Sequence, residues 1–144
     1  MSEVSGHFIS GRFSRIPIPV LEITFAVARP NGRDFEKSEI FWVDSGFDGD
    51  LKMPQSFGNQ LKGMGIQLVP ASGTNASGPM RSEIVQARIL RISLNGLQIP
   101  IPNAIDCILT CFGINNVAPL VGLNALSRWK VCLDIPNVNL SISS

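Results

Sequence analysis

The sequence contains few charged residues, a single histidine and no tyrosine. Only 16% of its 144 residues are charged, and 12 Lys and Arg are balanced by 11 Asp and Glu. This balance excludes an acidic or basic tail protein and provides no basic stripe for nucleic acid. The one histidine, His7, excludes chemistry that needs two histidines in one chain. With 44% apolar residues, the chain is long enough to form one domain with its own core.

A long apolar run is also absent. The most apolar segment, residues 16–28, is interrupted by Pro17, Pro19, Glu22 and Thr24, and it is too short to span a membrane. The first ten residues lack the basic and apolar regions of a signal peptide. We therefore expect a cytoplasmic protein that has no membrane partner.

Cysteine is scarce, and the three cysteines cannot all pair within one chain. Because no signal peptide is evident, Cys107, Cys111 and Cys132 are predicted to be reduced thiols that pack as small apolar side chains. Their spacing, with only His7 to add to them, is a poor match to a zinc site. We predict no metal and no cofactor.

The dominant pattern is an alternation of period two, which is typical of strands. It is clearest over residues 18–27, and the pairs Asn31-Gly32 and Asn95-Gly96 each predict a hairpin. Pro136-Asn137 predicts a third turn, and small residues over 71–79 predict an exposed loop or hairpin tip. Only residues 54–63 and 123–129 are predicted to be helical. The sum is an all-β single domain over residues 1–144, a closed or half-closed barrel with one or two short helices.

The segment most informative about function is Asp44-Ser45-Gly46, where an apolar strand ends in an acid, a hydroxyl residue and a glycine. Gly46 permits a tight turn, and the Ser45 hydroxyl can lock that turn. Asp44 is thereby held at the rim of the core, where its pKa can be perturbed. Taken alone, this tripeptide is more often a plain strand exit, since chance places it in about one chain of this length in twenty.

A second motif changes that estimate. Leu120-Val121-Gly122 precedes a short predicted helix, and an apolar–acid–apolar strand, a Pro-Asn turn and a last strand follow. In this order, the two motifs resemble those of the retropepsin-like (clan AA) aspartic proteases, over residues 38–142, with residues 47–54 similar to the bacterial members. The resemblance implies a closed single-domain β-barrel of the acid-protease type with a β-hairpin flap. It also implies an opening β-hairpin within the first 37 residues.

The resemblance implies an aspartic endopeptidase, a hydrolase that needs no cofactor. Because the chain carries one Asp-Ser-Gly motif, an active enzyme must be a homodimer in which two copies of Asp44 meet on a two-fold axis. Carboxylates about 3 Å apart share a proton and titrate as a pair. One Asp44 then acts as a general base on water, and the other protonates the scissile carbonyl. The implied partners are a second copy of the chain and an extended peptide or protein substrate.

The resemblance also implies supporting roles near Asp44. The Ser45 hydroxyl is expected to join the two active-site loops across the dimer, and the Gly46 carbonyl to face substrate. Asp48, beside Gly49, is at a position that often binds the substrate backbone, although it could simply cap the turn. The helix-preceding glycine motif is Leu120, Val121 and Gly122.

The flap is expected over residues 73–80, with Ser77, Gly78, Pro79 and Met80 near its tip and in contact with substrate. The alternative interpretation is an ordinary surface hairpin. One departure from the family is that no tyrosine, and no other aromatic residue, occurs at this flap. Away from the site, Lys52 and Lys62 are predicted to be solvated charges of a helix or loop.

Two other functions remain open from the sequence. The first is a catalytically silent retropepsin-like dimer that binds a peptide or protein without cutting it. The second is a small-ligand β-barrel in which Asp44 acts as a general base.

Overall fold

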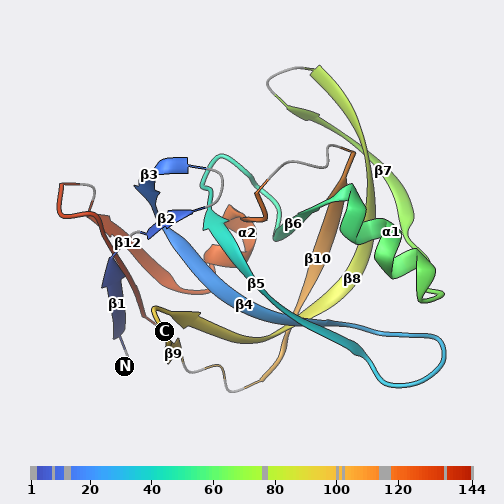
Figure 1. Ribbon diagram of the computed structural model, residues 1–144, viewed down its shortest axis with the longest axis horizontal. Coiled ribbons are helices and arrows are strands. Elements are labelled where there is room, and N and C mark those ends of the chain that lie inside the picture. The colour runs from blue at the N-terminus through green and yellow to red at the C-terminus, as the bar shows by residue number, and fades with distance from the viewer. Residues whose placement is uncertain are drawn as a thin grey trace.

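Strands make up most of the computed structural model, which describes residues 3–7, 9–11, 14–75, 78–99, 101, 103–113, 118–134 and 136–143 (Figure 1). Side chains are described over residues 18–72 and, within those ranges, from residue 81 onward. In chain order the elements are β1 (Glu3–His7), β2 (Ile9–Gly11), β3 (Ser14–Ile18), β4 (Val20–Val27), β5 (Phe35–Val43), β6 (Leu51–Pro54), α1 (Gln55–Gly63), β7 (Val69–Asn75), β8 (Gly78–Leu94), β9 (Leu97–Ile99), β10 (Ile105–Phe112), β11 (Leu120–Val121), α2 (Leu123–Leu126), β12 (Lys130–Asp134) and β13 (Asn139–Ser143). The all-β prediction is confirmed.

The main sheet has eight strands, and its pairings run β10-β6-β11-β5-β4-β8-β7, with β9 added on β8. β10 also pairs with β8. The pairings that run from β8 through β4, β5, β11 and β6 to β10 therefore lead back to β8. The strands β1, β13 and β12 form a separate three-stranded sheet, and β2 pairs with β3 in the expected opening hairpin. The finer prediction of a closed barrel stays a prediction.

The short strand β11 lies between two strands that are distant from it in sequence. It runs parallel to β5, with Leu120 beside Trp42, and antiparallel to β6, with Leu120 beside Lys52. The N–H of Asp44 donates to the carbonyl of Val121 at 3.0 Å and so extends this pairing past the end of β5. β11 therefore brings the second sequence motif directly to Asp44.

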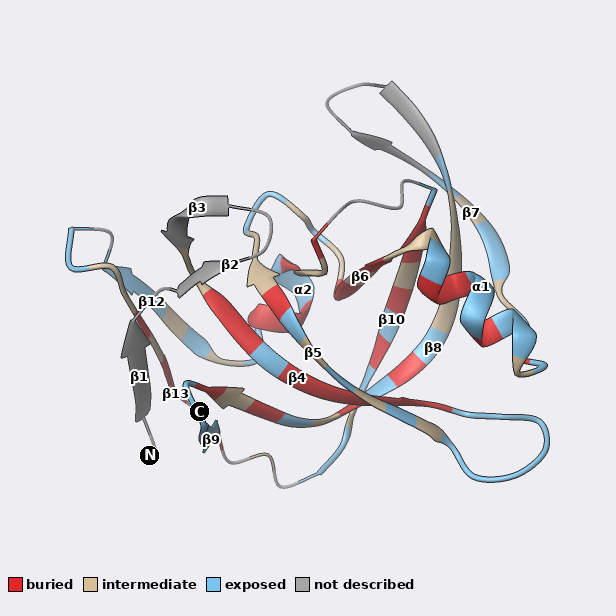
Figure 2. Cartoon of the chain, in the orientation of Figure 1, coloured by how far each residue is buried: buried red, intermediate tan, exposed pale blue. Residues whose placement is uncertain are grey.

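The register divides β5, β11, β6 and β10 into two faces, because paired residues in a sheet point to the same side. Towards the core point Val43, Val121, Leu51 and Leu109, and both leucines are 0% exposed. On the other side lies a row of half-buried side chains, which we call the outer row: Trp42, Leu120, Lys52 and Thr110. Figure 2 shows the same alternation of burial along β10.

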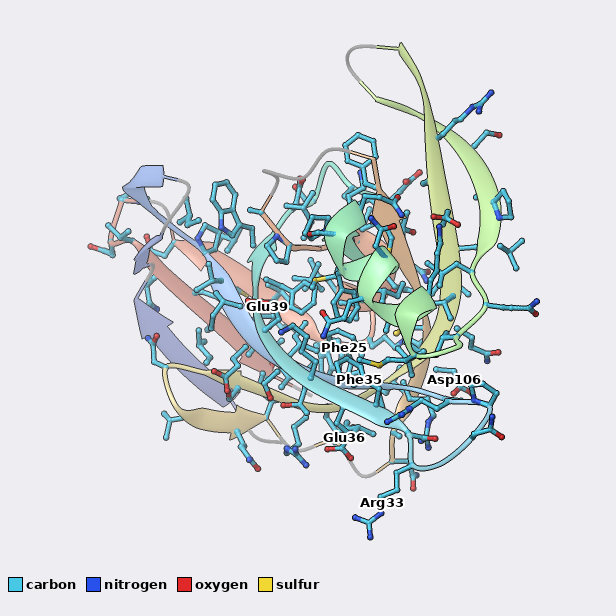
Figure 3. The ribbon with its side chains drawn as sticks, turned by 45° about the vertical axis from the view of Figure 1, so that its right-hand side comes forward. Phe25, Arg33, Phe35, Glu36, Glu39 and Asp106 are labelled. Carbon is cyan, nitrogen blue, oxygen red and sulfur yellow. The ribbon has the colours of Figure 1, made fainter. Side chains whose placement is uncertain are left out.

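Helix α1 covers one side of the core. It follows Pro54 and buries Phe57, Gly58 and Leu61 against the sheet. The Phe57 ring meets Phe25 edge to face with 5.8 Å between ring centroids, and Phe35 lies 6.1 Å from Phe57. In Figure 3, Phe25 and Phe35 lie beside α1 toward the middle of the molecule, whereas Arg33 extends away from it. Aromatic contacts of this kind hold the helix on the sheet.

The three predicted turns are present, but they differ in form. Asn95 and Gly96 have φ of 51° and 83°, so they form the expected two-residue turn between β8 and β9. At Asn31-Gly32 only Gly32 has positive φ, at 105°, and the connection spans residues 28–34. The hairpin prediction is confirmed there, with a longer connection than the two-residue turn between β8 and β9. Residues 136–138 connect β12 to β13 as predicted.

Two element predictions need correction. Of the two alternatives for residues 71–79, the loop is wrong, because Ala71 pairs with Ser82 and Asn75 with Gly78; residues 71–75 and 78–79 therefore belong to the paired strands β7 and β8, as the hairpin alternative predicts. Small residues are compatible with a strand when the partner strand satisfies their backbone groups. The second helix is shorter than residues 123–129, since α2 ends at Leu126 and continues as a turn through Trp129. The first helix is confirmed. No helix in the described ranges is long and apolar enough to cross a membrane.

Candidate functional site

Residues 44–50 form a turn at the end of β5, which we call the Asp44 turn. Asp44 fixes it from within: its Oδ1 accepts the Gly46 N–H at 2.8 Å, and its carbonyl accepts the Phe47 N–H at 3.2 Å. The Asp44 side chain is half-buried, and no group in the described part of the chain bonds to its Oδ2. One carboxylate oxygen is thus held within the turn, and the other has no partner among the described residues.

The segment after β11 pins the Asp44 turn from outside. The N–H groups of Gly122, Leu123 and Asn124 donate to the carbonyls of Asp50, Phe47 and Gly49 at 2.8, 2.7 and 3.2 Å. The first N–H groups of a helix have no partner inside it, so this turn takes up donors that α2 leaves unpaired. The two motifs that the sequence singles out therefore form one hydrogen-bonded unit.

Glycine is required where these two segments touch. A Cβ added at Gly122 would lie 2.4 Å from the Gly49 carbonyl oxygen and 2.6 Å from that of Phe47. A Cβ at Gly49 would lie 2.6 Å from the Phe47 ring. Backbone atoms at such distances cannot be displaced cheaply, so Gly122 permits the close approach that fixes the Asp44 turn.

Asp50 is a structural member of this site that the sequence interpretation did not identify. The residue is 7% exposed, and its carboxylate accepts hydrogen bonds from the Ile108 N–H at 2.8 Å and the Asn124 Nδ2 at 2.7 Å. These bonds connect the turn to β10 and to α2. No pattern in the sequence distinguishes Asp50 from the nearby acids Asp44 and Asp48, because its partners come from distant segments.

Ser45 and Asp48 both lie on the exposed side of the turn. The expectation that the Ser45 hydroxyl locks the turn within the chain is wrong, since the Asp44 carboxylate does so and no described group bonds to that hydroxyl. Asp48 makes no hydrogen bond within the described part of the chain, so it does not cap the turn at Gly49. Contacts of either residue with a second subunit or a substrate stay predictions.

The predicted flap corresponds to the hairpin of β7 and β8, whose described arms extend past the rest of the sheet in Figure 1. Gly78, Pro79 and Met80 pair with Asn75, Thr74 and Gly73. Ser77, the remaining residue expected at the tip, lies outside the described residues. Among residues whose contacts are described, no hydrogen bond joins this hairpin to the Asp44 turn. Its role as a flap stays a prediction.

Lys52 does not behave as a solvated charge. It lies in the outer row, half-buried, with its Nζ 4.9 Å from the ring centroid of Phe47 and 4.9 Å from that of Phe112. Lys62 is more exposed and pairs with Glu83, whose pKa this contact lowers, helped by a 2.8 Å hydrogen bond from Gln55. The prediction for Lys52 is therefore wrong, because the ring of Phe47 from the preceding turn and the ring of Phe112 from β10 both contact its ammonium.

Two of the three cysteines, Cys107 and Cys111, are buried. Burial raises the pKa of Cys107 to about 12, and the Asp50 carboxylate adds to the effect. Burial likewise raises the pKa of Cys111 to about 11, whereas Cys132 is exposed on β12. Among the described residues, no group of three or more His, Cys, Asp or Glu side chains could hold a metal ion.

Two hollows lie away from the Asp44 turn. One, of about 670 Å³, is lined mainly by apolar residues of the β4–β5 and α1–β7 connections and of strands β7 and β8, among them Ile66, Val69 and Ile84. The other, of about 620 Å³, lies between α1 and the base of the β7–β8 hairpin, beside Lys62, Arg81 and Glu83. Neither hollow is lined by a residue that the sequence predicts to be part of the site.

Comparison with known proteins gives similarities at the level of structure only. No protein-family model matches the chain, and no curated protein matches it. Among solved structures, the chain is similar to the crystal structure of a retropepsin-like aspartic protease from Rickettsia conorii. The two share 15% sequence identity, the alignment covers 98% of each chain, and the TM-score is 0.49.

Proposed function

We propose that the protein is an aspartic endopeptidase that acts as a homodimer, with Asp44 of each subunit in one shared site. The observation that carries the proposal is the state of the Asp44 carboxylate. It is half-buried at the end of a strand, one oxygen is bound by the Gly46 N–H, and no described group bonds to the other. A second Asp44 can share a proton with that other oxygen.

The rigidity of the Asp44 turn supports a catalytic role. Bonds from Gly122, Leu123 and Asn124 hold it on one side, and the buried Asp50 carboxylate holds it on another. Catalytic groups gain most when neighbouring residues fix them in a productive geometry before substrate binds. A plain strand exit needs none of these bonds.

In the proposed mechanism, two Asp44 carboxylates share one proton, because two negative charges at about 3 Å are unfavourable. The ionised Asp44 removes a proton from a bound water as that water attacks the scissile carbonyl carbon. The protonated Asp44 donates to the carbonyl oxygen. The C–N bond then breaks as the departing nitrogen takes up a proton.

The proposed substrate is a peptide in extended conformation, bound by main-chain hydrogen bonds and by contacts with the outer row. Trp42 and Leu120 are half-buried next to Asp44 and provide apolar surface for side chains beside the scissile bond. The β7–β8 hairpin is the proposed flap. A cytoplasmic location remains a prediction from the sequence.

The test is cleavage of a diverse peptide library by the wild type and by Asp44→Asn, from acid to neutral pH and at high protein concentration. We expect cuts by the wild type and none by the variant, because an amide cannot act as the general base. Sedimentation must show that the variant remains a dimer. A folded wild-type dimer that cuts nothing at any pH overturns the proposal and favours the peptide- or protein-binding module instead.

A further inference from the structure

The ammonium of Lys52 lies against two aromatic rings, and no acidic side chain in the described part of the chain pairs with it. Its Nζ lies 4.9 Å from the ring centroids of both Phe47 and Phe112. The only other half-buried cation whose side chain is described, Lys37, pairs with Glu39 at 3.9 Å. No carboxylate in the described part of the chain lies within ion-pair distance of Lys52.

Aromatic rings stabilise a cation, but they do not complete its hydrogen bonding. A lysine ammonium has three N–H donors, and a ring face attracts the charge without replacing an oxygen acceptor. In the described residues no protein atom accepts a hydrogen bond from the Lys52 Nζ. The donors of this half-buried group therefore remain available to a ligand.

The sheet places Lys52 beside the Asp44 turn. In the outer row it is next to Leu120, which in turn is next to Trp42. Trp42 is two positions before Asp44 along an extended backbone, so both belong to the same face. Phe47, which contacts the Lys52 ammonium, is itself part of the Asp44 turn. A peptide bound across Asp44 passes along this row.

We infer that Lys52, Phe47 and Phe112 form a subsite that selects an acidic side chain of the peptide substrate. The inference rests on the proposed function, because it assigns this subsite to the peptide that Asp44 cleaves. The Asp or Glu carboxylate of the substrate accepts hydrogen bonds from the ammonium, and a pair of this kind is stronger than one between neutral groups. The Phe47 and Phe112 rings stabilise the ammonium at this position.

The experiment measures kcat/KM on the best-cleaved peptides of the library, each compared with versions in which one Glu or Asp is replaced by Gln or Asn. We expect one position relative to the cut at which this replacement lowers kcat/KM at least tenfold in the wild type. In Lys52→Met, which keeps an unbranched side chain between the rings, the same replacement should lower kcat/KM by less than about threefold. Lys52→Arg should keep the preference, and Lys52→Glu should prefer Lys at the same position.

The control is Lys62→Met, which removes a lysine on α1 that pairs with Glu83, and it should keep the wild-type preference. If Lys52→Met does not fold, the comparison of Lys52→Arg with Lys52→Glu decides. Cleavage without an acidic preference, or a preference unchanged by Lys52→Met or Lys52→Glu, overturns the subsite and leaves the proposed protease intact. A wild type that cleaves no peptide overturns the proposed function and the subsite with it.

Discussion

At the scale of single residues, Asp50 determines how firmly the Asp44 turn is held. Asp50→Ala removes two part-buried hydrogen bonds to a charged acceptor, from the Ile108 N–H and the Asn124 amide, and one bond to a charged group contributes about 1.5–3 kcal/mol. We expect the free energy of unfolding in urea to fall by at least about 2 kcal/mol. The matched control is Asp48→Ala, which removes an exposed carboxylate from the same turn and should change stability by less than about 0.5 kcal/mol. Equal losses in both variants would contradict this account.

The cysteines give a second prediction at this scale, and it depends on pH. An ordinary thiol has a pKa of about 8.5 and is mostly thiolate at pH 9. The raised pKa values, about 12 for Cys107 and about 11 for Cys111, keep both protonated at that pH. We expect iodoacetamide at pH 9 to modify only Cys132 rapidly in the folded protein, as counted by mass spectrometry, and all three cysteines in urea. Cys132→Ser should abolish the fast reaction, and a second fast-reacting thiol would refute the prediction.

At the scale of elements, the contact between α2 and the Asp44 turn depends on Gly122. Gly122→Ala brings a Cβ to 2.4 Å from the Gly49 carbonyl oxygen, so the turn must move. Overpacking of this kind costs about 1–3 kcal/mol, and we expect a loss of that size together with loss of any peptide cleavage. Urea unfolding and the peptide assay measure the two effects.

The control for this substitution is Gly63→Ala, at the end of α1. Nothing lies within 4 Å of a Cβ built there, and alanine is the better helix former. This variant should be as stable as the wild type or slightly more stable. A Gly122→Ala protein with unchanged stability would show that the turn can shift without cost.

The sequence predicts a structural feature well when the residues that determine it are close together along the chain. Asn95-Gly96 predicts its turn correctly because the conformation depends on those two residues alone. At Asn31-Gly32 the same pair forms a longer connection, since the pairing of β4 with β5 sets where each strand ends. Residues 71–75 look like part of a loop by composition, yet β8 supplies partners for their backbone.

The candidate site shows the same division. The Asp44 and Gly122 motifs can be found from their local order, and the structure joins them. Asp50 and Lys52 could not be found in this way. Asp50 bonds to the backbone of β10, and Lys52 contacts the ring of Phe112, and both partners are distant in sequence. Polar residues acquire such roles only when distant segments meet around them.

At the scale of the whole molecule, the proposed site is complete only in a dimer. If the dimer is weak, activity must rise faster than linearly with protein concentration, because the active fraction then depends on association. We expect this curvature over the concentration range in which sedimentation shows monomer and dimer together. Proportional activity down to concentrations at which only monomer sediments would rule out the shared site.

The position of β11 between β5 and β6 also determines when this chain can fold during synthesis. Leu120 and Val121 are made long after β5 and β6, so a ribosome releases those two strands with unpaired edges facing each other. Pairings between distant parts of a chain form slowly, and open strand edges promote aggregation in the interval. The Asp44 turn is thus among the last regions to reach its final geometry, and a nascent chain that stops before residue 120 cannot form it.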